Sequence, residues 1–451
     1  MATQTATCSD TVELTNLATN KSTHPSTPEA DPNPEPEPAT APGTLSRATY
    51  LKLISAGFSF FVAGVNDGSI GALLPYVIRE YHVSKAIVSS VYGANFFGWL
   101  AAAIFNTHLC QYLDLGAMLF LGALCQVIAH ALRSWDPPFG LFVATFWIVS
   151  IGQAFQDTHA NTYVAGVGAN SHRWLAFIHA MYMAGCLVGP FVSTGVASAG
   201  ASSGHSHWYL FYTFPLGIGV ANLAFVAVSF RDTLRLTRSK PAEPAEPEQT
   251  LGTALNNENN SSDELESKNK GAMDLIKATV ATPSVWLLCM FFFFYIGSVL
   301  TASGWVVEYL VDVRHGDLTS MGYVPAGFNG GCLLGRLLLA EPTHRFGARR
   351  MVFLYCVLAL ALQLVFWLVP NIIAASIAIS FVGFFTGPLF ATGIELGSKL
   401  FPRRIQSTAL ALVFVFAQMG GSVFPIITGI ISSGAGVKVL QPILVTLLAA
   451  T

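Results

Sequence analysis

The sequence is poor in charged residues. Lys, Arg, Asp and Glu make up 11% of its 451 residues, against about 25% in an ordinary soluble domain. Together with a hydrophobic fraction of 53%, this excludes a typical water-soluble globular protein. The formal net charge of −2 leaves no basic surface of the kind that nucleic-acid binding needs, so no nucleic-acid partner is expected. The composition predicts a polytopic membrane protein.

Cysteine pairs and motifs for metals or nucleotides are also lacking. The seven cysteines are scattered and include no Cys-x-x-Cys pair, so we interpret them as small buried hydrophobic residues, not as a disulfide framework or a zinc site. The sequence has no phosphate-binding G-x-x-x-x-G-K-S/T loop, which argues against an ATP-driven pump. We therefore expect no metal, no cofactor and no enzymatic activity.

The apolar residues gather in runs of the length that crosses a bilayer, about 20 residues. We expect an all-α integral membrane protein with about twelve membrane-spanning helices. The expected spans are 51–78, 85–106, 115–134, 139–166, 174–198, 208–230, 284–311, 319–340, 350–369, 372–398, 406–432 and 438 to the end. The last run is short, so either this helix ends inside the membrane against its neighbours or the chain is a truncated version of a longer protein. We favour truncation.

The spans divide into two halves of six, residues 49–230 and 284–451. Residues 1–48 are rich in Thr, Ser, Pro, Glu and Ala, which predicts a disordered cytoplasmic tail without a cleaved signal peptide. Residues 231–283 form a polar cytoplasmic linker, in which the stretch 273–277 could form a short amphipathic helix. Most Lys and Arg residues fall on the tail and linker side, so both termini are predicted to be cytoplasmic. Arg133 is counted with the few charges of the outer loops.

An aspartate and its asparagine neighbour, Asp67 and Asn66, lie inside the first span. A carboxylate at bilayer depth costs at least about 2.5 kcal/mol on insertion scales, so it is tolerated where it faces a wet cavity or a partner. The pair indicates a path for protons or solute. The alternative is a polar residue that serves only to pack one helix against another.

The fourth span contains a second carboxylate. Asp157 shares one helix face with Gln153 and Asn161 at i, i+4 spacing, whereas His159 points elsewhere. Asp157 is our first candidate for a residue that takes up and releases a proton, and Asp67 is the second. Each has the same structural alternative.

The loop after the eighth span carries a glycine and arginine motif. It consists of Gly335, Arg336, Arg345, Gly347, Arg349 and Arg350. This pattern resembles the G-x-x-x-D-R-x-G-R-R loop of the major facilitator superfamily. The resemblance implies a gating loop with a tight glycine turn and arginines that pair with helix ends; alternatively, the arginines only anchor the orientation. The matching loop of the first half, residues 106–116, has lost its basic residues.

Within the superfamily, three stretches resemble the L-fucose/proton permease group and similar fungal transporters. They are Asn66-Asp67 with Leu73-Leu74-Pro75, the segment Asp157–Asn161, and the segment Arg173–Gly185. The resemblance implies proton coupling by Asp157, with Asn161 beside it, and a sugar pocket lined by His179 and Tyr182. Asp67 lies eight residues before Pro75 and is not a strict positional match. His179 could equally be a packed core histidine.

Further polar and aromatic residues complete the candidate substrate site. Asn66, Asn161 and Asn329 lie in spans one, four and eight. Trp305 in span seven could stack on a sugar ring or simply pack in the core. Glu308, near the outer end of span seven, is a candidate for an extracellular gate.

The resemblance implies a secondary transporter in the plasma membrane that moves a small polar solute by alternating access. Our first expectation is proton-coupled uptake of a sugar-like solute by a monomer. The partial exporter element Gly185-x-x-x-Gly189-Pro190 leaves proton-driven efflux of a metabolite as an alternative. A transport-inactive receptor or scaffold is the alternative of another class, which buried ionisable groups disfavour.

Overall fold

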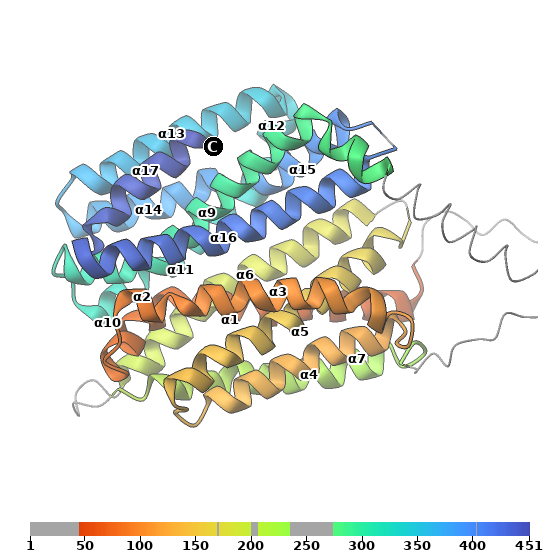
Figure 1. Cartoon of the computed structure of the whole chain (residues 1–451), viewed down its shortest axis with the longest axis horizontal. Coiled ribbons are helices and arrows are strands. Elements are labelled where there is room, and N and C mark those ends of the chain that lie inside the picture. The colour runs from red at the N-terminus through yellow and green to blue at the C-terminus, as the bar shows by residue number, and fades with distance from the viewer. Residues whose placement is uncertain (1–44, 169–170, 200–205, 235–273, 403) are drawn as a thin grey trace, which may run out of the picture. The chain divides into compact units, whose positions relative to one another are not determined.

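The computed structural model describes residues 45–168, 171–199, 206–234, 274–402 and 404–451. The predicted tail (1–48) and linker (231–283) lie largely outside these ranges. Within the described residues every regular element is a helix (Figure 1). Residues 274–280 form a short helix where the amphipathic segment was expected to begin.

Within its described residues, the first half contains six long helices and two short ones. In chain order they are α1 (Arg47–Glu80), α2 (Lys85–Val88), α3 (Ser90–Leu109), α4 (Leu115–Arg133), α5 (Phe139–Ala165), α6 (Ser171–Ala199), η2 (Trp208–Tyr212) and α7 (Thr213–Ser229), with the helix at 274–280 beyond them. The second half follows with α9 (Pro283–Asp312), α10 (Leu318–Met321), α11 (Val324–Leu338), α12 (Ala340–Phe346), α13 (Ala348–Leu368), α14 (Ile372–Thr386), α15 (Leu389–Leu400), α16 (Gln406–Ala435), η3 (Val437–Val439) and α17 (Leu440–Ala450).

Ten of the twelve expected spans correspond to helices that are long and apolar enough to cross a membrane. The expected span 319–340 is divided between α10 and α11, and α11 has only 15 residues. Pro325 lies in the first turn of α11, where its missing N–H is tolerated, so the helix restarts there instead of continuing from α10. The last span is the short apolar helix Val437–Ala450.

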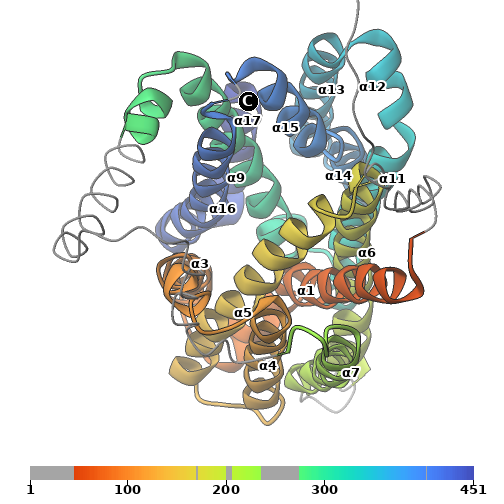
Figure 2. The ribbon, with the colours of Figure 1, turned by 90° about the vertical axis from the view of Figure 1, so that its right-hand side faces the viewer.

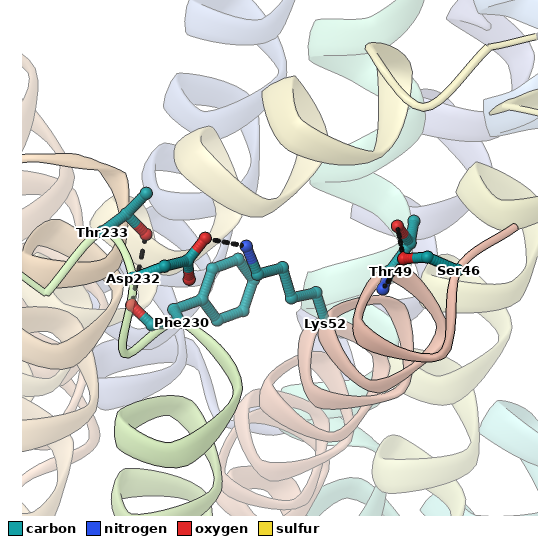
Figure 3. A network of polar contacts seen from close by, with 6 residues as sticks. All are labelled: Ser46, Thr49, Lys52, Phe230, Asp232 and Thr233. Atoms are coloured by element: carbon teal, nitrogen blue, oxygen red, sulfur yellow. Dashed lines mark hydrogen bonds and ion pairs between the residues drawn. The ribbon is translucent and has the colours of Figure 1, made fainter.

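One end of the molecule carries the attachment points of the linker. Near the start of α1, Lys52 donates a hydrogen bond of 2.6 Å to Asp232, just after α7, and its ammonium lies 5.5 Å from the centre of the Phe230 ring (Figure 3). Ser46 caps the first turn of α1 by accepting from the Thr49 amide. The helix α9 begins at the same end (Figure 1), which we call the linker end.

Glycines bring helices of each half into backbone contact. A Cβ on Gly64 of α1 would lie 2.0 Å from the Tyr182 carbonyl oxygen of α6. A Cβ on Gly185 of α6 would lie 2.1 Å from the Phe61 carbonyl oxygen of α1. In the second half, a Cβ on Gly420 of α16 would lie 2.0 Å from a carbonyl oxygen of α9. Small residues allow such close approach between membrane helices. The α1–α6 contact also places Tyr182 beside Asp67.

The two halves meet at the end opposite to the linker end. Lys85 of α2 forms ion pairs with Glu308, at 3.2 Å, and with Asp312, both on α9. The Ala86 amide donates to the Ser433 hydroxyl of α16 at 2.7 Å. The helices α2 and α16 run beside each other there (Figure 1). Figure 2, seen from the linker end, shows the helices of the first half grouped below those of the second.

Candidate functional site

The candidate site is built around the carboxylate of Asp67, which is half-buried in the middle of α1. One oxygen accepts hydrogen bonds from the amide nitrogens of Asn66 at 2.9 Å and Gln153 at 3.0 Å. The other accepts from the Tyr182 hydroxyl at 2.9 Å. These donors come from α1, α5 and α6. A carboxylate in low-dielectric surroundings is therefore held by three neutral groups.

Arg133, at the end of α4, is the site residue that sequence reasoning missed. It does not lie in an outer loop, because its exposure is 0%. Its Nη1 donates to the Asn66 side-chain oxygen at 2.7 Å, and its Nε donates to the Thr145 hydroxyl at 2.6 Å. The guanidinium lies 3.8 Å from the centre of the Phe146 ring. Asn66 thus bridges Arg133 and Asp67.

A second buried polar residue, His130, lies one turn before Arg133 on α4. Its exposure is 0%, and neither ring nitrogen has a hydrogen-bond partner among the described residues. The ring stacks on Tyr212, with centroids 6.4 Å apart. The spacing of His130 and Arg133 inside an apolar run was the signal in the sequence that could have predicted a buried polar face on α4.

Asp157 and Asn161 lie on α5, beyond Gln153 toward the linker end. Asp157 is half-buried and lies one helical turn before Asn161. Four residues along an α-helix correspond to about 6 Å, so Asp157 follows Gln153, the donor to Asp67, by one turn on the same face of α5. His159 lies apart, as expected: its Nε2 is 2.8 Å from the Asn106 side-chain oxygen on α3.

Asn329 joins the two halves at the level of this network. Its side-chain nitrogen, buried on α11, donates to the Cys186 carbonyl oxygen of α6 at 3.0 Å. Pro190 lies four residues after Cys186 within α6 and has no N–H, so this carbonyl has no helical donor. Asn329 satisfies the carbonyl from the other half, one turn from Tyr182.

The structure places two predicted substrate residues away from this network. The His179 ring packs between Phe60 and Phe390, with centroids 5.4 and 6.0 Å away. Trp305 is fully buried, and its indole N–H donates to the Pro425 carbonyl oxygen at 3.1 Å. Both surroundings are those of packed aromatic residues, and the predicted contacts with a solute remain predictions.

The glycines and Arg336 of the predicted gating loop occupy constrained positions. A Cβ on Gly335 would lie 1.9 Å from the Phe384 carbonyl oxygen of α14. Arg336 donates from Nε to the Gly387 carbonyl oxygen at 3.1 Å, at the C-terminal end of α14. Gly347 has a φ of +93°, which glycine adopts without strain. Arg336 therefore pairs with a helix end, as the motif predicts.

The remaining arginines of the loop, Arg345, Arg349 and Arg350, are exposed around α12 and the start of α13. Arg345 lies 5.9 Å from the centre of the Phe346 ring. Their gating role remains a prediction. Among the described residues no group of three His, Cys, Asp or Glu side chains could hold a metal ion.

Comparison with known proteins identifies the family. The family model described as Major Facilitator Superfamily matches residues 56–425. Bypass of stop codon protein 6 from Saccharomyces cerevisiae is 25% identical over 405 residues, which are 86% of this chain and 78% of that protein.

Solved structures share the fold at low identity. A bacterial homologue of the human lysosomal transporter Spinster, inward-facing and unoccupied, has a TM-score of 0.67 at 12% identity over 90% of this chain and 95% of that one. The transporter FucP in the outward conformation has a TM-score of 0.60 at 18% identity, over 90% of this chain and 97% of that one. The predicted family and all-α membrane fold are confirmed. The chain belongs to the major facilitator superfamily, whose members are secondary transporters that work by alternating access.

Proposed function

We propose that this protein is a proton-coupled transporter of a small polar organic solute, with Asp67 and Asp157 as the coupling carboxylates. The observation that carries the proposal is the arrangement around Asp67, whose two oxygens accept hydrogen bonds from donors on α1, α5 and α6. A residue that only packs helices does not need an ionisable group, because a neutral amide would serve at lower cost.

Proton binding at Asp67 would change the packing of three helices. An ionised carboxylate only accepts hydrogen bonds, whereas the protonated group also donates one. The bonds from Gln153 and Tyr182 would then have to rearrange, and these residues belong to α5 and α6. Such a link between proton binding and helix packing is what coupled alternating access requires.

Asp157 supports the same proposal from the linker end. It follows Gln153 on α5 by one helical turn and precedes Asn161 by another. Asp67, Gln153 and Asp157 therefore form a line of polar groups along which a proton could pass between the centre of the molecule and the linker end.

We propose uptake of a sugar-like solute, with both termini in the cytoplasm and the monomer in the plasma membrane as the working unit. Support comes from the resemblance to the fucose permease group and from the basic residues near the tail and linker. Efflux is the second candidate. The glycines of the exporter-like element, Gly185 and Gly189, pack on α1, where added Cβ atoms would lie 2.1 and 2.5 Å from carbonyl oxygens. This packing explains them without an exporter function.

The test uses the full chain in proteoliposomes with an imposed pH gradient and a panel of hexoses, deoxyhexoses and polyols. Solute-dependent proton flux and solute accumulation are measured for the parent, Asp67→Asn and Asp157→Asn. We expect both variants to lose accumulation against a gradient while Asp67→Asn keeps solute exchange at equilibrium. Asp136→Asn, at an exposed loop carboxylate, is the matched control.

Each outcome has one meaning. Accumulation by both variants at the parent level would refute coupling by these carboxylates. If the solute moved against its own gradient in the direction opposite to the flow of protons, efflux would be favoured. An absence of flux with every solute, unchanged by either variant, would favour the scaffold alternative.

A further inference from the structure

The function of Asp67 leaves the buried arginine on α4 unexplained. Arg133 has no exposure and makes no ion pair among the described residues. Removing a guanidinium from water costs several kcal/mol unless a counter-charge and hydrogen bonds compensate for it. Its Nη1 and Nε have partners, but Nη2 has none. The Asp67 carboxylate, which Asn66 connects to Arg133, is the counter-charge that can compensate for this cost.

The bridging amide can adopt only one orientation. Arg133 only donates hydrogen bonds, so the oxygen of the Asn66 amide must face it, at 2.7 Å. The amide nitrogen must then face Asp67, where it donates at 2.9 Å. A flipped amide would place two donors against each other at Arg133. The arginine therefore determines which atom Asn66 presents to the carboxylate.

The arginine itself is held rigidly. The Thr145 hydroxyl accepts from Nε at 2.6 Å, and the rings of Phe146 and Tyr212 lie 3.8 and 5.1 Å from the guanidinium carbon. Aromatic faces stabilise a cation, by about 2 kcal/mol or more when it is desolvated. This pocket is inside the first half, away from the contact between halves, so its geometry need not change when the halves move.

We propose that Arg133 is a positioning residue for proton coupling, which acts through Asn66 to hold the Asp67 carboxylate in its coupling geometry. This inference rests on the proposed function of Asp67. Arg133 does not touch the solute or the proton. The titratable groups that line the same region are His130 and Arg133 on α4, Tyr182 and Cys186 on α6, Tyr212 on η2 and Asp157 on α5.

The transport test compares Arg133→Gln, Asn66→Leu and the double variant. We expect each single variant to lower proton-driven accumulation at least about tenfold, which corresponds to the loss of one charge-assisted hydrogen bond. Solute exchange should change little in Arg133→Gln. The double variant should be no worse than either single one, because both remove the same connection. Arg133→Lys should restore part of the accumulation. Arg314→Gln, in the second half, is the matched control, since Arg314 donates only to main-chain oxygens.

A second measurement is independent of transport. The melting temperatures of Arg133→Gln, Asp67→Asn and their combination should be non-additive, and this non-additivity should vanish when Asn66 is leucine. The positioning role would be overturned if the melting-temperature changes of Arg133→Gln and Asp67→Asn were additive. It would also be overturned if the losses of accumulation and of exchange in Arg133→Gln and Asn66→Leu multiplied in the double variant. Non-additive melting temperatures with normal accumulation in Asp67→Asn would keep the physical link and refute the proposed function instead.

Discussion

Replacing Lys85 with methionine should open the end of the molecule opposite to the linker end. Lys85, Glu308 and Asp312 form a cluster that we call the Lys85 clamp, in which one cation of the first half holds two carboxylates of the second. The Glu308 side chain is 6% exposed and that of Lys85 is 19% exposed. In Lys85→Met, the two carboxylates of α9 lose the cation supplied by the other half, and Glu308 stays buried without it, which disfavours the closed arrangement.

The magnitude follows from distance and burial. At the observed 3.2 Å, an effective dielectric constant of about 20 gives a gross attraction of about 5 kcal/mol, most of which is offset by desolvation. Exposed ion pairs contribute about 0.2–1 kcal/mol, and breaking a buried one costs about 3–5 kcal/mol. The Lys85 clamp lies between these cases, so we expect about 1–3 kcal/mol, a change of roughly 5- to 150-fold in the ratio of open to closed molecules.

Distances between spin labels would measure this change. Ile87 on α2 and Ile430 on α16 are 50% and 56% exposed, and their helices pack together at this end. Double electron–electron resonance should show a longer and broader distance distribution in Lys85→Met and Glu308→Gln than in the parent. The control is Lys438→Met, an exposed lysine after α16. The reasoning fails if both clamp variants keep the parent distribution, or if the control broadens it equally.

Three smaller predictions concern stability. Gly185→Leu should destabilise the protein by about 1–3 kcal/mol or prevent folding, because its Cβ would lie 2.1 Å from a carbonyl oxygen of α1. The control Gly217→Ala places its Cβ in open space and should be tolerated. Thermal melting of the two variants measures the difference. Gly347→Ala should cost about 1–3 kcal/mol because of its φ of +93°, measured in the same way. The hydrogen bond from Lys52 lowers the pKa of Asp232 from its usual 3.8, so the pair stabilises the folded state above that pH and is lost as the pH falls below it. Asp232→Asn should therefore lower stability by at most about 1 kcal/mol at pH 7 and leave it unchanged at a pH well below the folded-state pKa of Asp232.

The expected helices follow from the length of apolar runs, but breaks within them do not. Runs of apolar residues report burial in lipid, and this signal does not depend on the rest of the chain. The division at Pro325, and a similar one at Pro388 before α15, depends on how neighbouring helices satisfy the freed backbone groups. An apolar run with a proline is compatible with a kinked, a broken or an uninterrupted helix, so its outcome is set by packing.

The candidate site was only partly predictable for the same reason. Asp67 stood out because a carboxylate in an apolar run is costly wherever the run folds. Its partners Tyr182 and Gln153 belong to other helices. The distance to Tyr182 depends on the glycine packing between α1 and α6, and the distance to Gln153 depends on how α5 packs against α1. Arg133 was assigned to a loop because it ends an apolar run, and counting charges cannot tell a loop arginine from one that turns inward.

The helix α6 connects Asp67 to the contact between the halves. Tyr182 donates to Asp67, and one turn later the Cys186 carbonyl oxygen accepts from Asn329 of the second half. Pro190 leaves this carbonyl without a helical donor, so the bond to Asn329 replaces one that the helix cannot make. If Tyr182 rearranges when Asp67 binds a proton, as the proposed function requires, the change begins one helical turn from the Asn329 bond. Loss of that bond would leave a buried acceptor unsatisfied, at a cost of about 1–3 kcal/mol. That cost is comparable to the expected contribution of the Lys85 clamp. Under the proposed function, a change at Asp67 that broke this bond would therefore shift the balance between the closed and open arrangements by a similar amount.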